Sequence, residues 1–253
     1  PYRRQRQMCI RDSTEGEKIN VVVPTGNFGN ILAAFYAKNM GLPINKLICA
    51  SNENKVLYDF FTTGEYDRNR EFVLTTSPSM DILISSNLER LIYRIAGNNA
   101  AKNAELMASL KSEGKYKITD DMKAQLTDFY GNYATEAEDA STIKKIYEDC
   151  GYVIDTHTSV AATVYDKYRK ETGDTTKTVI ASTASPYKFS GSVLAAIGKD
   201  TNADEFGLVD ELAEVSKIPV PASLAALKDK EVRFTKVIDK ADMKDYIYSA
   251  LGI

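Results

Sequence analysis

Two short, mainly apolar runs, INVVV at residues 19–23 and KLICAS at residues 46–51, constrain the fold of this chain most strongly. Each run is continuous and too short for a helix, which is typical of strands buried on both faces of a parallel sheet. Between them, residues 30–40 carry apolar side chains at helical spacing, and Gly41 and Pro43 follow as stop signals. The pattern predicts a strand–helix–strand unit.

The same alternation returns later in the chain. Further helices are predicted at about residues 54–62, 86–96, 159–170, 189–197, 209–215 and 241–251, with strands at 152–155 and 177–181 and a strand-like run at 231–238. Residues 100–150 are polar and predict a peripheral helical layer with turn breaks at Gly114 and Gly131. We therefore expect an α/β fold with an open, mostly parallel sheet and helices on both faces.

The composition argues against several classes of function. The chain is 43% hydrophobic with a net charge of -3 and no basic stretch in its main part, so a nucleic-acid partner is not expected. No apolar run approaches the ~20 residues of a membrane helix. Three distant cysteines, Cys9, Cys49 and Cys150, and one histidine cannot make a Cys/His zinc site and favour a reduced, cytoplasmic protein.

The first thirteen residues, PYRRQRQMCIRDS, differ from the rest of the chain. They are rich in arginine, lack an apolar period and begin with Pro1. An Arg-rich targeting segment is one reading; we favour a non-native or fragment-edge segment, with the natural protein starting upstream. Residues 14–253 then form the part on which the fold prediction rests.

The loop PTGNFGN at residues 24–30 joins the first strand to its helix. Gly26 and Gly29 permit close approach of the backbone, and the helix N-terminus favours an anion, so the loop predicts a phosphate site. A tight turn with Asn30 as helix cap is the alternative. The loop is neither GxxxxGK[ST] nor GxGxxG, although Glu53 after the next strand leaves a dinucleotide site open.

A second stretch, VIASTASPYKF at residues 179–189, places small hydroxyl residues between a strand and a helix. Together with the first loop it is similar to a pyridoxal phosphate site, in which a Gly/Asn cup holds the phosphate and a Ser or Thr hydroxyl meets the pyridine nitrogen. A neutral hydroxyl there suits eliminations and replacements on amino acids. Helix capping by Ser185 or an ordinary turn is the alternative.

Four ordered motifs carry a family resemblance. PTGNFGN, SPSMDILISSNLERL at residues 77–91, IDTHTSVA at residues 154–161 and ASTASPYKF at residues 181–189 together resemble threonine synthase. Many members have histidine and alanine where this chain has Ser185 and Tyr187, and some have Pro-His in place of Thr156 and His157. We interpret these differences as subfamily variation.

The resemblance implies pyridoxal phosphate fold type II, the tryptophan synthase β-like fold, incomplete at its N-terminus. It implies conversion of O-phospho-L-homoserine and water into L-threonine and phosphate by a lyase of threonine biosynthesis. It implies a cofactor-phosphate cup of Gly26, Asn27, Phe28, Gly29 and Asn30, Thr183 at the pyridine nitrogen with Ser182 as substitute, and substrate-phosphate contacts from Ser86, Asn87 and Arg90.

Two of these residue roles have ordinary alternatives. Arg90 is equally well explained as a solvated helix charge. His157 is more simply a structural hydrogen-bonding residue, with pocket lining as the second reading.

The family's Schiff-base lysine lies upstream of the phosphate loop, in a Phe-Lys-Asp context that no lysine here shares; Lys188 is not that lysine. We therefore expect this chain to be the C-terminal part of the enzyme, inactive without the missing N-terminal domain. Alternatives are another fold type II enzyme, of the serine/threonine dehydratase or cysteine synthase kind, a dinucleotide-binding domain, or a non-catalytic phosphate-binding domain.

Overall fold

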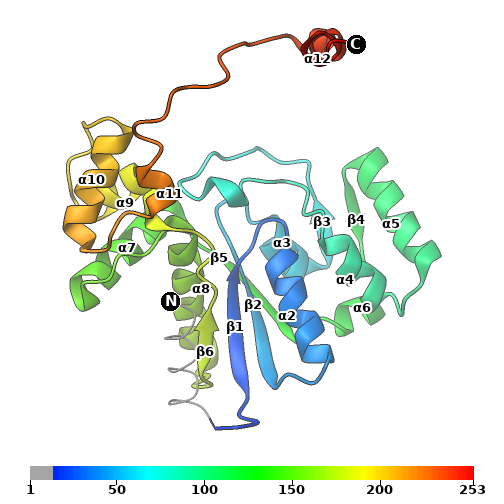
Figure 1. Cartoon of the computed structure of the whole chain (residues 1–253). Helices are drawn as coiled ribbons and strands as arrows, with labels where there is room; N and C mark the ends of the chain where they lie inside the picture. The colour runs from blue at the N-terminus through cyan, green and yellow to red at the C-terminus, as the bar shows by residue number, and fades with distance from the viewer. Residues whose placement is uncertain (1–13) are drawn as a thin grey trace. The chain divides into compact units, whose positions relative to one another are not determined.

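A computed structural model describes residues 14–253, so the predicted non-native segment 1–13 lies outside the described residues. The chain divides into two units, with the boundary along the sequence between Lys217 and Ile218. The first unit holds the sheets and most helices, and the second is the C-terminal segment Ile218–Ile253 (Figure 1). Each is described by itself.

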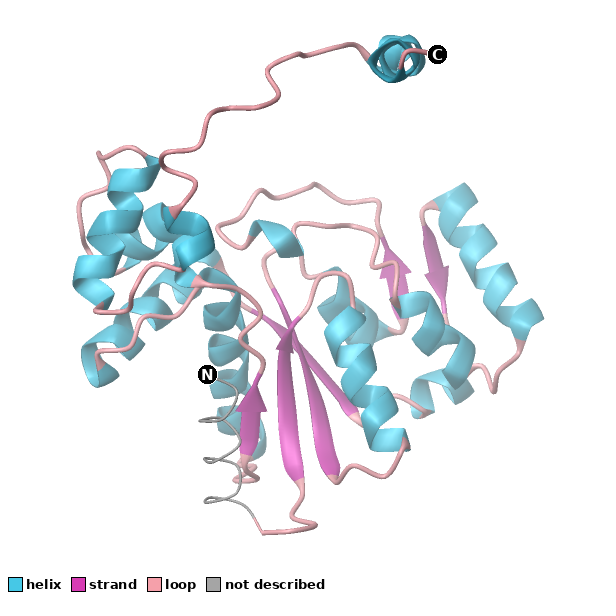
Figure 2. Cartoon of the chain, viewed as in Figure 1, coloured by secondary structure: helices cyan, strands magenta, loops and turns pink. Residues whose placement is uncertain are grey.

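The first unit is built on a four-stranded sheet with the order β5-β2-β1-β6. The strands are β1 (Ile19–Pro24), β2 (Ile44–Ser51), β5 (Phe129–Tyr133) and β6 (Thr178–Ile180). All three pairings are parallel, with Val22 opposite Ile48 and Ile180, and Leu47 opposite Phe129. The predicted α/β fold with a mostly parallel sheet is confirmed (Figure 2).

Alternate residues of the central strands pack into two separate cores. Val23, Leu47 and Cys49 belong to a cluster with the helices of one face, whereas Val22 and Ile48 pack with a cluster on the other. Because both faces of β1 and β2 are covered, their sequences read as continuous apolar runs instead of alternating ones.

Helices cover the two faces. The first face carries α2 (Gly29–Asn39), α3 (Val56–Thr63) and α4 (Leu88–Ile95), and the second carries α8 (Thr156–Thr172), against which α7 (Glu136–Cys150) packs. The rest of the unit comprises α5 (Ala100–Glu113), α6 (Asp120–Ala124), α9 (Ser190–Ala196), α10 (Glu205–Ser216) and the short 3-10 turns η1 (Pro78–Met80) and η2 (Pro186–Phe189).

Residues 100–150 are only partly the helical layer that the sequence predicts. They supply α5, α6 and α7, but also β4 (Lys115–Lys117), which pairs antiparallel with β3 (Glu65–Asp67), and the edge strand β5. The turn expected at Gly131 is wrong, because Gly131 lies inside β5. A Cβ there would come within 3.1 Å of the Phe61 side chain, so glycine permits close packing rather than a turn.

Two predicted strands are absent from the described residues. Residues 152–155 form the loop that ends at Asp155, the N-cap of α8. Residues 231–238, in the second unit, have no regular structure, and Val232, Phe234 and Val237 are 74%, 82% and 94% exposed. No described strand pairs with these residues, so their β-branched side chains do not form part of a sheet.

The second unit contains α11 (Ala222–Ala225), the turn η3 (Lys240–Asp242) and α12 (Met243–Leu251). The helix predicted at 241–251 therefore corresponds to α12 with its preceding turn. Within residues 14–253, no helix combines the length and the apolar character needed to cross a bilayer.

Candidate active site

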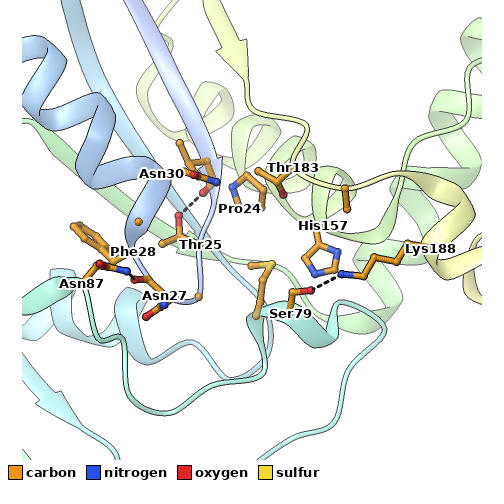
Figure 3. A pocket seen from close by; sticks show the side chains of 15 residues that line it. Pro24, Thr25, Asn27, Phe28, Asn30, Ser79, Asn87, His157, Thr183 and Lys188 are labelled. Carbon is orange, nitrogen blue, oxygen red and sulfur yellow. Dashed lines mark hydrogen bonds between the residues drawn. The ribbon is translucent and has the colours of Figure 1, made fainter. Parts of the chain in front are cut away.

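The strand order places a candidate site where the chain reverses direction across the sheet. From β1 the chain moves to β2 on one side, whereas β6 joins β1 on the other. Open α/β sheets bind ligands at the carboxyl ends of strands that flank such a reversal. A cavity of about 290 Å³ lies there, lined by the loop after β1, the loop after β6, η1 and the start of α8 (Figure 3).

The loop after β1 is anchored by an aromatic side chain. Phe28 precedes α2 in the left-handed conformation, with φ of +62°, which is uncommon for a residue with a side chain. Its ring is 1% exposed and lies 6.1 Å from Phe61 and 6.0 Å from Phe129, centroid to centroid. Burial of the ring holds the sharp turn in place while the backbone of Phe28 faces the cavity.

This turn leaves a row of backbone donors free. Among residues 14–253, the N–H groups of residues 27–31 have no hydrogen-bond acceptor. The first N–H groups of any helix lack partners within the helix, and here the preceding turn adds more of them. Because these donors also lie at the positive end of the α2 dipole, the loop is suited to an anion such as a phosphate.

Gly26 allows the loop to lie against the turn η1. A Cβ on Gly26 would stand 2.8 Å from the Cα of Met80 and 3.3 Å from the Ile82 side chain. The Met80 backbone cannot yield as a flexible side chain could, so this position requires glycine. Gly29 is different, since a Cβ there would meet only the amide of Asn87, at 3.5 Å.

Residues 85–87 hold the loop from outside. Ser85 Oγ donates to the Gly26 carbonyl at 2.8 Å, and the N–H and Oγ of Ser86 donate to Asn27 Oδ1 at 2.8 and 2.6 Å. Asn87 Nδ2 donates to the Asn27 carbonyl at 2.8 Å. Because Asn27 Oδ1 is occupied by Ser86, the Asn27 Nδ2 group remains as a donor for a ligand.

The predicted substrate residues separate into two kinds. Asn87 lines the cavity, whereas Ser86 and Arg90 are not among its lining residues. Arg90 donates from a guanidinium nitrogen to Asn87 Oδ1 at 2.6 Å, and so orients the amide that reaches the loop. Ser86 therefore contacts the loop through Asn27, and Arg90 contacts Asn87, which holds the loop.

The loop after β6 brings Thr183 to the cavity. Ser182, its predicted substitute, is not a lining residue; its Oγ lies 3.0 Å from Thr158 Oγ1. Ser185 caps η2 by accepting from the Tyr187 N–H at 3.4 Å, and the Tyr187 ring is buried. Of the hydroxyl residues in this stretch, Thr183 is thus the one placed to meet a ligand.

Four further residues, largely missed in the sequence, complete the wall. The polar residues Ser79 from η1, His157 from α8 and Lys188 from η2 line the cavity together with the apolar Met80. Lys188 Nζ lies 3.4 Å from Ser79 Oγ, and the His157 ring is only 3% exposed. Ser79 and Lys188 both stand in motifs that carry the family resemblance, but neither motif predicts that they line a cavity together; only the fold brings them within 3.4 Å of each other.

Asp155 positions His157. Its side chain caps α8 by accepting from the N–H groups of His157 and Thr158 at 2.9 and 3.2 Å, and from Thr158 Oγ1. Burial raises the pKa of Asp155, but the hydrogen bonds from His157 and Thr158 outweigh it and hold the pKa below its usual value. The carboxylate is therefore ionised beside the imidazole, with Oδ1 3.5 Å from Nδ1.

The dinucleotide site that the sequence left open finds little support here. Glu53, which such a site needs, is not among the residues that line the cavity. Within the described residues, no three His, Cys, Asp or Glu side chains gather closely enough to hold a metal ion.

Comparison with known proteins identifies what this arrangement is similar to. Residues 158–247 match the family model described as "Threonine synthase, C-terminal". The chain is 44% identical over 184 residues to human "Threonine synthase-like 1", and 36% identical over 221 residues to threonine synthase of Saccharomyces cerevisiae. These matches cover 72% and 81% of this chain but 24% and 43% of the relatives, so the chain spans less than half their length.

Solved structures give the same result. The fold matches the yeast threonine synthase crystal structure with a TM-score of 0.78 and 34% identity, covering 93% of this chain and 48% of that one. It matches pyridoxal-phosphate-bound threonine synthase of Brucella melitensis with a TM-score of 0.72 and 34% identity, covering 83% and 47%. The predicted fold type and the family resemblance are both confirmed.

Proposed function

We propose that this chain, a relative of the threonine synthases over part of their length, forms the phosphate cup and the pyridine-facing wall of a pyridoxal phosphate site. One observation carries the proposal. Residues 27–30, whose N–H groups have no acceptor among the described residues, and the hydroxyl-bearing loop of Thr183 line the same cavity at the point where the strand order reverses. The cavity therefore combines an anion site with a neutral hydroxyl group.

The residues present fit this cofactor. The N–H groups of Asn27, Phe28, Gly29 and Asn30, with the Asn27 amide, hold the phosphate, and Gly26 lets the loop lie flat on η1. Thr183 meets the pyridine nitrogen with a neutral hydroxyl. When bound, pyridoxal phosphate supplies an electron sink for charge that develops on the carbon atoms of an amino acid.

For the complete protein we propose conversion of O-phospho-L-homoserine and water into L-threonine and phosphate, a carbon–oxygen lyase reaction. Asn87 contacts the substrate phosphate, and Ser86 and Arg90 support this contact. Ser86 fixes Asn27 and Arg90 fixes Asn87, so both groups keep the amides of the cavity oriented. A preorganised donor binds a developing negative charge without first having to reorient.

We place the Schiff-base lysine outside residues 14–253. Within that range Lys188 is the lysine that lines the cavity, and it lies on the η2 wall away from the phosphate loop. Accordingly, the chain alone binds the cofactor phosphate without turning over substrate. The free cysteines of the described residues, Cys49 and Cys150, agree with a cytoplasmic setting for the protein.

Cofactor binding by the 253-residue chain tests this proposal. We expect pyridoxal phosphate to shift its ³¹P resonance on titration with the chain, and pyridoxal, which lacks the phosphate, to compete poorly. Asn27→Ala should weaken binding about tenfold, since it removes one donor and the partner of Ser86. Equal binding of pyridoxal phosphate and pyridoxal would exclude a phosphate cup.

Other enzymes of fold type II, such as serine/threonine dehydratases and cysteine synthase, are the nearest second candidates. They share the cup, but the resemblance of the SSNLER segment and of residues 181–189 is to threonine synthase. Release of phosphate from O-phospho-L-homoserine by the complete protein, with no deamination of serine, separates the two.

A further inference from the structure

The Asp81 carboxylate, which directly follows η1, accepts four hydrogen bonds. Its Oδ1 accepts from Asn52 Nδ2 at 2.7 Å, from Thr75 Oγ1 at 2.7 Å and from Asn54 Nδ2 at 3.1 Å. Its Oδ2 accepts from the Thr75 N–H at 2.9 Å. One side chain therefore joins the residues that follow β2 to a loop that contains η1.

These four contacts require an acceptor at both oxygens of Asp81. Within the described range no Lys, Arg or His side chain forms an ion pair with it, so its partners in the fold are all neutral donors. A carboxylate has about four lone pairs and donates nothing, whereas asparagine would turn one of the two acceptors into a donor. That donor would face either the Thr75 N–H or the three groups at Oδ1. The surroundings therefore select aspartate over its amide.

Asn52 and Asn54 form a fixed base for this link. They are buried, at 2% and 3% exposed. Asn52 Oδ1 accepts from the Asn54 N–H at 3.2 Å, and the Asn54 amide exchanges two hydrogen bonds with the backbone of Val73, at 2.9 and 3.0 Å. Because β2 ends at Ser51, immediately before Asn52, the end of this strand sets the position of Asp81.

The same strand end also sets the phosphate loop. The Thr25 N–H donates to the Ala50 carbonyl of β2 at 2.8 Å, and Gly26 follows directly. From the other side, Asp81 is adjacent to Met80, whose Cα would lie 2.8 Å from a Cβ on Gly26. Two connections from the end of β2, one through Thr25 and one through Asp81, therefore meet where Gly26 lies against η1.

We infer that Asp81 is a positioning residue of the candidate site: by joining η1 to the residues after β2, its carboxylate holds the Met80 backbone against Gly26 and so fixes the shape of the phosphate loop. Asp81 acts through Met80, because it is not itself among the residues that line the cavity. The inference rests on the proposed function for the identity of the anion in the loop, though not for the contact between η1 and Gly26. A loop whose donors are already held in place binds an anion without first having to reorder.

A double-mutant cycle tests the contact that Asp81 holds. Urea unfolding is measured for the unmodified chain, Gly26→Ala, Asp81→Asn and the double variant. If Asp81 fixes η1, the Met80 backbone can give way to the alanine side chain once Asp81 is replaced. Gly26→Ala should then lower the urea midpoint by no more than about half as much in the Asp81→Asn chain as in the unmodified chain. Equal shifts in the two backgrounds would overturn the inference.

Two controls show whether any such coupling is specific. Gly29→Ala changes the same loop where a Cβ has room, so its effect should be equal with and without Asp81→Asn. Asp67→Asn replaces an aspartate at the end of β3 that accepts from the Asn69 N–H at 2.8 Å, and it should leave the Gly26→Ala shift unchanged. Coupling of the same size in either control would indicate a general weakening of the chain and would count against the inference.

Thr75→Val is a milder change in the same link. It removes the hydroxyl that donates to Asp81 Oδ1 and keeps the N–H that donates to Oδ2. The Gly26→Ala shift should therefore become smaller in this background too, though by less than with Asp81→Asn. Thr75→Val takes the place of Asp81→Asn in the cycle if that chain does not fold, and an unchanged Gly26→Ala shift would then refute the role of Asp81.

Binding of pyridoxal phosphate separates this inference from the proposed function. At a temperature where melting curves show each variant to be folded, ³¹P NMR titration should give about fivefold weaker binding for Asp81→Asn and unchanged binding for Asp67→Asn. Coupling in the cycle without any binding by the unmodified chain would mean that Asp81 holds the loop but that the proposed function fails. Binding without coupling, or with unchanged affinity in Asp81→Asn, would overturn the inference and leave the proposed function intact.

Discussion

At the scale of single residues, Gly26 and Gly29 have different tasks although they belong to one short motif. Gly26 has no room for a Cβ, because the Met80 backbone lies 2.8 Å from where it would stand. Gly29 has that room and instead begins α2, next to the unpaired N–H groups. The motif alone predicts that glycines are needed, but which glycine is sterically required depends on η1, a turn far along the chain.

We predict that Gly26→Ala weakens pyridoxal phosphate binding about tenfold or more and lowers the free energy of unfolding by about 1–3 kcal/mol, the usual cost of an overpacked site. Gly29→Ala is the matched control and should unfold at the same denaturant concentration as the unmodified chain or above it. Chemical denaturation of both variants gives the comparison. A Gly26→Ala chain as stable as the control would mean that the loop does not rest on η1.

Asp139 on α7 is a buried acid with one unpaired oxygen. It is 2% exposed, accepts from Thr76 Oγ1 at 3.2 Å through Oδ2, and has no partner for Oδ1 among the described residues. Burial raises the pKa of Asp139 to about 7, and the Glu136 charge adds to the effect. The carboxyl group therefore keeps its proton at pH values where an exposed aspartate has lost it.

This pKa predicts a pH-dependent stability. Between about pH 4 and pH 7 the folded chain keeps a proton on Asp139 that the unfolded chain has lost, so the free energy of unfolding should fall as pH rises, by up to about 1.4 kcal/mol per unit. Above about pH 7 this contribution levels off. Urea unfolding of the unmodified chain and Asp139→Asn at about pH 5 and pH 8 measures it, on either side of the folded-state pKa; an identical pH slope for the two would refute the assignment.

At the scale of elements, the N-cap of α8 both ends a loop and positions a residue of the candidate site. Asp155 lies directly before the helix, orders its first turn and stands beside the His157 imidazole. Asp204 caps α10 by accepting from the Gly207 N–H at 2.7 Å, but on the exposed surface. The two caps use the same chemistry at very different depths.

We expect Asp155→Ala to lower the free energy of unfolding by about 2 kcal/mol or more, because it removes a cap and leaves buried donors unpaired. Asp204→Ala should cost about 1 kcal/mol, the usual cost of an exposed cap. Denaturation of both variants under one set of conditions tests the difference. Equal losses would indicate that burial adds nothing to the Asp155 cap.

The sequence predicted the elements that carry strong local signals. The helix predicted at 30–40 corresponds to α2, and the strand predicted at 46–51 corresponds to β2. Both were predictable because the strand is apolar on both faces and because glycine and proline follow the helix. By contrast, β5 (FYGNY) is an edge strand with Gly131 and Asn132 in it, and only its pairing with β2 defines it. The run at 231–238 has strand residues but no partner strand among the described residues.

The site was predictable to the same degree. Residues 26–30 and 183 stand in motifs that chemistry and family resemblance mark, and all of them line the cavity. Ser79 and Lys188 were not predicted, because they come from turns 109 residues apart that meet only in the fold. Their cavity-lining position is a product of tertiary structure.

At the scale of the whole molecule, the first unit presents a cavity at the carboxyl ends of its strands, built from the loops after β1 and β6 and from η1 and α8. The chain spans 47% and 48% of the two threonine synthase structures that it matches. We propose that this part of the protein binds and orients anions, and that the covalent chemistry belongs to a lysine elsewhere in the complete protein.

The most direct test is an assay of the complete protein, in which this chain is joined to its upstream sequence. Phosphate and threonine are measured after addition of O-phospho-L-homoserine, with the unmodified protein beside Gly26→Ala. We predict equal amounts of phosphate and threonine from the unmodified protein, and loss of both activity and bound pyridoxal phosphate in Gly26→Ala. Absence of threonine from a protein that has bound the cofactor, or full activity of Gly26→Ala, would contradict the account.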